Sequence, residues 1–120
     1  MNRILWLIGV VLVVGCGSPP DGPFEEYYDN GQLMMKGTVR DGKEDGLFES
    51  YYENGQLMGK WTYKDGVRNG PREYYYSDGR LSSKGTYKEG ERDGLYERYY
   101  YDKGQLEKVE TYTYKDGERD

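Results

Sequence analysis

The sequence predicts an all-β protein, an elongated antiparallel meander of stacked β-hairpins made from about four 24-residue repeats. Two series of glycines recur every 24 residues: Gly31, Gly55 and Gly79, and Gly46, Gly70 and Gly94. Each repeat holds a turn dipeptide between two stretches in which apolar and polar residues alternate, the pattern of a half-buried hairpin. The 15 tyrosines suit a thin sheet that buries rings and leaves hydroxyls in water.

The first residues are typical of an export signal. Arg3 supplies a positive charge, and an apolar run follows from Ile4 to Val14. As a helix this run would span about 17 Å, well short of the roughly 30 Å core of a bilayer. We therefore predict a cleaved signal peptide over residues 1–15 rather than a transmembrane anchor.

The segment Val13-Val14-Gly15-Cys16 resembles the lipobox of bacterial lipoproteins. The resemblance implies cleavage after Gly15 and thioether linkage of a diacylglycerol to the sulfur of Cys16. The alternative is an ordinary signal peptide whose cleavage site contains a cysteine. Acyl chains on Cys16 predict attachment to a membrane, which becomes stable when two or three chains are present.

Residues 16–23 then form a short Pro-rich tether behind the acylated cysteine. Gly17 stands where an Asp would resemble the inner-membrane retention signal of enteric bacteria. The predicted location is therefore the cell envelope, and in a diderm organism the outer membrane, facing the periplasm or the cell surface.

The repeat domain is predicted over residues 24–120. Its four copies have related sequences: residues 24–47, 48–71, 72–95 and 96–120. One hairpin is only marginally stable in water, so stacking several is what closes a continuous core.

Within the second copy, Asn54-Gly55 is predicted to form a two-residue type I′ turn. That turn places Phe48 opposite Trp61, Glu49 opposite Lys60, Tyr51 opposite Met58 and Tyr52 opposite Leu57. The same register predicts one cross-strand ion pair within each of three hairpins: Glu25–Lys36, Glu49–Lys60 and Glu73–Lys84. The opposite face, predicted to be buried, carries mostly apolar and aromatic residues: Tyr28, Leu33, Val39, Phe48, Tyr52, Leu57, Trp61, Tyr63, Tyr76, Leu81 and Tyr87.

The connections between hairpins contain Asp41-Gly42, Asp65-Gly66 and Glu89-Gly90, which are also turn residues. The fourth copy departs from the others. Asp102-Lys103-Gly104 is predicted to be a three-residue loop with Gly104 left-handed, and Lys108 and Glu110 replace apolar or small residues. Charges on a terminal strand discourage edge-to-edge pairing, so we interpret this copy as a cap.

The repeat YYENGQLMGKWTYKDG, closed by RNG or RDG, resembles the bacterial variant of the MORN repeat over essentially residues 24–120. The resemblance implies an elongated stack of β-hairpins without catalytic activity. Bacterial proteins of this type are often described as antitoxin-like or immunity-like, and eukaryotic relatives as membrane-associated scaffolds.

Composition argues against several functions. The net charge of −5, with the predicted signal removing a further positive residue, opposes binding to a phosphate backbone, so no nucleic-acid partner is expected. The chain has no histidine, and its serines lack an adjacent base, so we expect no enzyme. Asp41, Asp45 and Gly46 match positions of a calcium loop, but Lys43 and Tyr52 occupy others that ligands require. We predict no metal and no cofactor.

A tyrosine-rich surface is the candidate binding site. It comprises Tyr27, Tyr51, Met58, Tyr75 and Tyr99, beside the predicted Glu–Lys pairs. Tyrosine offers rigid, amphipathic contact area for a protein or a glycan. The alternative is that these rings only cover the sheet.

The leading functional prediction is a membrane-anchored, non-enzymatic lipoprotein that binds a protein partner or serves as a scaffold at the envelope. The alternative is an antitoxin or immunity protein that neutralises a basic toxin. A glycan hydrolase would need a carboxylate held in a cleft, which a flat meander does not predict.

Overall fold

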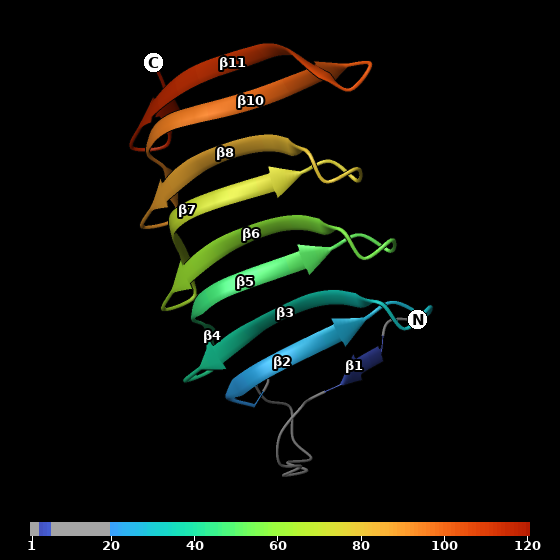
Figure 1. Ribbon diagram of the computed structural model, residues 1–120. Helices are drawn as coiled ribbons and strands as arrows, with labels where there is room; N and C mark the ends of the chain where they lie inside the picture. Colours follow the sequence, from blue (N-terminus) through green and yellow to red (C-terminus); the bar gives the residue numbers. More distant parts are fainter. Residues whose placement is uncertain (1–2, 6–19) are drawn as a thin grey trace.

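A computed structural model describes residues 3–5 and 20–120 of the chain. Over these residues the protein is all-β, and its strands form one antiparallel sheet that follows the sequence as a meander (Figure 1). The predicted fold class is therefore confirmed. Cys16, and the predicted signal peptide apart from residues 3–5, lie outside the described residues.

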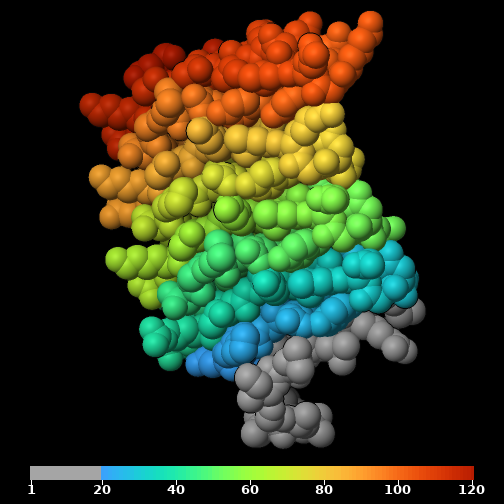
Figure 2. Space-filling model, in the orientation of Figure 1, coloured from blue at the N-terminus to red at the C-terminus, as the bar shows by residue number. Residues whose placement is uncertain are grey.

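Four hairpins build the sheet, and Figure 2 shows them stacked in sequence order as successive bands. They are hairpin one, β2 (Gly22–Tyr27) and β3 (Leu33–Arg40); hairpin two, β5 (Gly46–Tyr51) and β6 (Leu57–Lys64); hairpin three, β7 (Val67–Tyr75) and β8 (Leu81–Lys88); and hairpin four, β10 (Gly94–Asp102) and β11 (Gln105–Lys115). The remaining strands are short: β1 (Arg3–Leu5), β4 (Lys43–Glu44), β9 (Glu91–Arg92) and β12 (Glu118–Arg119). The β1 strand pairs with the outer edge of β2.

The turns inside hairpins one to three differ from the predicted type. In hairpin two, the Gly55 N–H donates to the Tyr52 carbonyl at 2.9 Å and the Tyr52 N–H donates to the Gln56 carbonyl at 2.8 Å. Gly55 has a φ of 87°, whereas Asn54 is not among the residues with positive φ. This is a three-residue loop, a type I turn followed by a left-handed glycine. The type I′ prediction was wrong because the Asn54 Oδ1 instead accepts the Gln56 N–H at 2.9 Å.

The two-residue type I′ turns lie elsewhere. Between hairpins, Asp41 and Gly42 have φ values of 50° and 75°, the paired positive angles of this turn. In hairpin four, Asp102 pairs with Gln105, which leaves a two-residue turn of Lys103 (φ 47°) and Gly104 (φ 83°). Gly104 is left-handed as predicted, but the predicted three-residue loop at residues 102–104 was wrong because the strand pairing continues through Asp102.

The strand register is correct for the half of each hairpin far from its turn. Phe48 faces Trp61, Glu49 faces Lys60 and Ser50 faces Gly59, as predicted. A bulge then shifts the register, so that Tyr51 faces Leu57 rather than Met58. The three-residue loop pairs each β5 residue beside the turn with a β6 residue one position earlier than predicted, and the extra residue Met58 then restores the predicted register.

The core lies on one face of the sheet, here called the core face. A cluster of buried apolar residues on this face comprises Phe24, Val39, Phe48 and Trp61. Phe48 is 3% exposed, and its ring centroid lies 5.5 Å from that of Phe24 and 6.5 Å from that of Trp61. The opposite face is here called the ladder face.

A glycine makes room for the ring of the following hairpin. A methyl group added at Gly37 would lie 2.6 Å from the Phe48 ring, and one at Gly59 would lie 2.5 Å from the Tyr74 ring. No real side chain tolerates such distances without a shift of its surroundings. Close approach, rather than a special φ, is therefore what these strand positions require.

Side chains at each turn bind the next hairpin. The Tyr28, Tyr52 and Tyr76 hydroxyls donate to main-chain carbonyls of Tyr51, Tyr75 and Tyr99 at 2.6, 2.7 and 2.9 Å. Of these donors, Tyr76 is 37% exposed, which corrects its predicted burial. Because the same hydrogen bond recurs between successive hairpins, each hairpin packs on the next in the same relative position.

Candidate functional site

The ladder face carries three rows of side chains that run across the strands. The first row contains the predicted tyrosines: Tyr27, Tyr51, Tyr75 and Tyr99. The second row alternates acid and base: Glu25, Lys36, Glu49, Lys60, Glu73, Lys84 and Glu97. The third row contains Pro23, Thr38, Leu47, Thr62, Pro71, Thr86, Leu95 and Thr113.

The tyrosine row is fixed by hydrogen bonds along each strand. The hydroxyls of Tyr51, Tyr75 and Tyr99 donate to the glutamate two residues earlier, at 2.8, 2.5 and 2.7 Å. Tyr27 makes the same bond to Glu25. Residues two apart on a strand share a face, which is why this contact recurs in every hairpin. The structure thus brings the four predicted tyrosines onto one face and holds each ring by its hydroxyl.

Met58 occupies a different place from the one predicted. It is the extra residue of the bulge in hairpin two, and Leu57 rather than Met58 is the partner of Tyr51. Met58 lies two residues before Lys60 and is half-buried. Since residues two apart on a strand point to the same side, Met58 belongs to the ladder face, but it does not face Tyr51 across the strands.

The acid–base row joins neighbouring hairpins. Salt bridges form between Lys36 and Glu49 at 3.0 Å, between Lys60 and Glu73 at 3.2 Å, and between Lys84 and Glu97 at 3.2 Å. The predicted partners do face each other within hairpins, yet each lysine bridges to the glutamate of the following hairpin instead. The lysines are 42–47% exposed, so solvent screens these ion pairs and each contributes little to stability alone.

These contacts fix the protonation states of the row. A hydrogen bond from Tyr75 and one from Lys60 lower the pKa of Glu73, and the bond to Glu73 raises the pKa of Tyr75 to about 12. Burial raises the pKa of Glu49, but hydrogen bonds from Lys36 and Tyr51 bring it below the usual value overall. At neutral pH the carboxylates are therefore ionised and Tyr75 is protonated.

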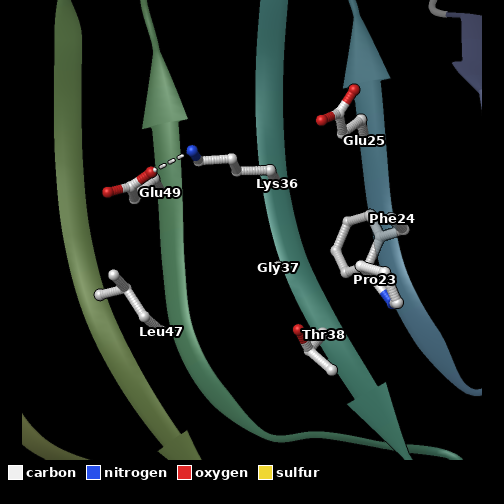
Figure 3. Close-up of a pocket in the computed structure, with 8 residues that line it drawn as sticks. All are labelled: Pro23, Phe24, Glu25, Lys36, Gly37, Thr38, Leu47 and Glu49. Atoms are coloured by element: carbon white, nitrogen blue, oxygen red, sulfur yellow. Dashed lines mark ion pairs between the residues drawn. The ribbon is translucent and has the colours of Figure 1, made fainter. Parts of the chain in front are cut away.

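Two shallow hollows flank the third row. One, of about 450 Å³, is lined by Pro23, Thr38, Leu47 and the acid–base row, and Figure 3 shows Leu47 and Thr38 below the Lys36–Glu49 pair. The other, of about 280 Å³, lies between Leu47 and Pro71. Leu47 is 53% exposed and Leu95 is 54% exposed, so this row offers apolar surface to a partner.

The third row was not predicted from the sequence, although the sequence contains its signal. Pro23, Leu47, Pro71 and Leu95 recur every 24 residues, and each lies two residues before a ladder glutamate. The alternation of side chains along a strand therefore places them on the ladder face.

Within the described part of the chain, no group of three acidic, cysteine or histidine residues is arranged to hold a metal ion. No helix there is long and apolar enough to cross a membrane. Cys16 cannot be placed relative to the ladder face, because it lies outside the described residues.

Comparison with known families gives three consecutive matches to the model described as MORN repeat variant, over residues 20–41, 44–65 and 68–89. Together they span more than half of the chain. Hairpin four follows the last match, and it has Thr111 where hairpins one to three have lysine. No curated protein matches the chain.

Proposed function

Because the chain belongs to the MORN repeat variant family, we propose that it is a membrane-anchored, non-enzymatic module of the cell envelope that binds a protein partner on its ladder face. Repeats of this family generally serve in protein or membrane binding. The observation that carries the proposal is the three-row composition of the ladder face, with fixed rings, charged pairs and exposed leucines side by side.

This composition suits a protein partner. Protein interfaces combine aromatic anchors and apolar contact with a polar rim, and tyrosine contributes area at a low entropic cost. The rings of Tyr51 and Tyr75 are already held by glutamates, so little side-chain freedom is lost on binding. Leu47 and Leu95 supply the exposed apolar contacts.

The same contacts favour binding over catalysis. A general acid needs a carboxyl group that is protonated near neutral pH, whereas the pKa values of Glu49, Glu73 and Glu97 are lowered by their tyrosine and lysine partners. The chain has no histidine to act in their place. The two hollows are shallow, and Glu49 and Glu73 in their linings form salt bridges with lysines.

The lipobox resemblance supports anchoring through Cys16. Residues 17–21 would then link the acylated cysteine to hairpin one, whose first strand begins at Gly22 and which starts the stack nearest to the membrane. Metabolic labelling with a radioactive fatty acid tests this step. The parent chain should carry label and sediment with membranes, and Cys16→Ser should lose both. Label retained by Cys16→Ser would overturn the anchor.

A pull-down with the soluble Cys16→Ser chain against envelope extract tests the binding face. Adding Leu47→Glu and Leu95→Glu places two charges in the third row and should abolish saturable capture. The matched control is Leu106→Glu, because Leu106 is 55% exposed but lies beside the turn of hairpin four, outside the three rows.

Equal capture by the double variant and the control would exclude the ladder face as the binding site. Capture of a secreted toxin by the parent, lost in the double variant, would identify the immunity role as the specific form of this function.

A further inference from the structure

The core face changes in character along the stack. Equivalent positions of hairpins one to four form columns, of which four matter here: Phe24, Phe48, Arg72 and Tyr96; Glu26, Ser50, Tyr74 and Arg98; Gly37, Trp61, Gly85 and Tyr112; and Glu44, Arg68, Arg92 and Arg119. Two of the columns begin with glutamate and end with arginine. At hairpin four Glu110 also lies on this face, opposite Arg98, but it is paired with Lys108, so the face is acidic at hairpin one and on balance basic at hairpin four.

The basic end consists of arginines stacked on tyrosine rings. The Arg72 guanidinium lies 4.9 Å from the Tyr74 ring centroid and 5.0 Å from that of Tyr96, and Arg119 lies 3.9 Å from the Tyr112 centroid. Residues 20–120 provide no salt-bridge partner for Arg72, Arg98 or Arg119. Tyrosine rings cover the flat sides of Arg72 and Arg119, whereas Arg98 lies opposite Glu110, whose carboxylate is paired with Lys108.

Neighbouring tyrosines respond to this positive charge. Burial raises the pKa of Tyr87, but the hydrogen bond with Arg92 and the charges of Arg72 and Arg92 lower it overall below the usual value. The pKa of Tyr96 is lowered in the same way, against the effect of burial, by Ser83, Arg98 and Arg72. An anionic group is thus favoured at this end of the face.

The acidic end forms no salt bridge with the part of the chain from residue 20 onward. Glu26 is half-buried and Glu44 is exposed, and neither forms an ion pair with any residue from 20 to 120. Within residues 20–120, the core face therefore carries glutamates at one end and arginines toward the other that form no salt bridge, separated by the length of the stack.

We propose that two copies of the chain pack core face against core face with their stacks reversed. A two-fold axis parallel to the strands, between hairpins two and three, brings hairpin one of each copy against hairpin four of the other. Glu26 and Glu44 then meet Arg98 and Arg119 of the second copy at both ends.

The other possible alignment is excluded by charge. If the stacks ran in the same direction, acidic end would meet acidic end and basic end would meet basic end. Like charges brought together in an interface cost several kcal/mol. The reversed alignment is therefore the one that the columns select.

The face is large enough for a specific dimer. Eight hairpin strands spaced about 4.8 Å apart and about 20–25 Å long give roughly 800–900 Å² per copy. A standard specific interface buries about 800 Å² per partner. Two features weaken the association: Arg68 and Arg92 fall at the same level in the reversed alignment, and each copy has a net charge of −5. We therefore expect a dimer in the micromolar range.

This inference does not rest on the proposed function, because it uses the opposite face. It leaves both ladder faces exposed on the outside of the dimer, so that one dimer would present two binding surfaces.

Charge reversal at the four end positions tests the dimer. The variants are Glu26→Arg with Glu44→Arg, and Arg98→Glu with Arg119→Glu, each in the soluble Cys16→Ser chain. All four positions are half-buried or exposed, so circular dichroism should show both variants folded. Each variant alone should associate at least about tenfold more weakly than the parent, because like charges meet at both ends.

Mixing the two variants is the decisive step. In a mixed dimer each new arginine meets a new glutamate, so sedimentation equilibrium should show twice the chain mass again. The matched control is Lys64→Glu with Lys88→Glu, which makes the same charge change at exposed ends of ladder-face strands and should leave the dimer unchanged.

A parent chain that stays monomeric, or a mixture of variants that does not associate, would overturn the proposal. Loss of the dimer in the control would do the same, since net charge rather than the core face would then govern association. Binding of poly-glutamate by a monomeric parent, lost with Arg98→Glu and Arg119→Glu, would replace the second copy with an acidic partner.

Discussion

Hairpins one and two differ from hairpins three and four in how they fill one and the same backbone. In the first half, Phe24, Phe48 and Trp61 form an apolar core over close-packed glycines. In the second half, Arg72 takes the place of the phenylalanines and lies buried among tyrosine rings. The ladder face, by contrast, keeps its Glu–Lys contacts through both halves.

The contrast shows what the repeat preserves. The contacts that join one hairpin to the next are retained. The side chains on the core face change, from phenylalanine and tryptophan rings in the first half to arginines stacked on tyrosine rings in the second. If a core side chain is truncated, the rigid rings of the first half cannot move into the cavity. The long, flexible arginine side chains of the second half can. The two halves should therefore respond differently to equivalent substitutions.

Truncation of a core ring should give the largest difference. Phe48→Ala is expected to lower the free energy of unfolding by about 3–5 kcal/mol, because Phe48 is 3% exposed and its neighbours cannot collapse into the space. Tyr96→Ala should cost less, about 2 kcal/mol, since Arg72 and Arg92 can cover the gap. Urea denaturation measures both. Equal losses would show that the two halves are equally rigid.

Substituting alanine for a strand glycine should also destabilise the first half more than the second half. Gly37→Ala forces a shift of the Phe48 ring and should destabilise by about 1–3 kcal/mol. At Gly85 the nearest atom, on the Tyr96 ring, lies 3.0 Å away, so Gly85→Ala should change stability by less than about 1 kcal/mol. Thermal unfolding of the two variants decides the point, and a Gly85→Ala loss as large as that of Gly37→Ala would contradict it.

Tyrosine ionisation should distinguish the ladder face from the arginine-rich half. The folded pKa of Tyr75 is about 12, above its ordinary value of 10.0, so its contribution to stability is complete below pH 10 and is lost as pH rises toward 12. Tyr87, with a lowered pKa, should ionise before Tyr75 in an absorbance titration.

The variant Tyr75→Phe should accordingly flatten the fall in melting temperature between pH 10 and pH 12. Tyr52→Phe is the matched control, because its hydroxyl bonds a carbonyl rather than a carboxylate. An unchanged slope in Tyr75→Phe would show that the bond to Glu73 does not persist in solution.

The ladder ion pairs, common to both halves, should show the smallest effect. Lys60→Gln is expected to cost about 0.3–0.5 kcal/mol, and the loss should disappear in about 1 M salt. Lys64→Gln, an exposed lysine with no ion pair within residues 20–120, serves as the control. A loss that persists in high salt would point to packing of the Lys60 stem rather than to its charge.

Much of the fold follows from the 24-residue period. The period placed the hairpins, and the pairing of Glu49 with Lys60 placed the distal register correctly. Near the turns, prediction failed because Asn-Gly accepts two loop types that differ by one residue. Only the hydrogen bond from Gln56 to the Asn54 side chain selects the longer loop.

The candidate site was predicted in part for a similar reason. Strand alternation brought the tyrosines together, but it could not show which glutamate each lysine would bridge. Lys36 faces Glu25 within its own hairpin and Glu49 on the adjacent strand of the next hairpin. Which glutamate forms the salt bridge depends on how the two hairpins pack. The row of Leu47 and Leu95 was missed because proline takes the same position in the other two copies, which obscures the recurrence of apolar residues there.

The bonds from Tyr28, Tyr52 and Tyr76 to the next hairpin have a consequence for how such a protein can change in length. Each joins a residue to another 23 positions later, so duplication of a whole 24-residue unit inside the stack recreates every contact it interrupts. The stack can therefore grow or shrink by whole units during evolution.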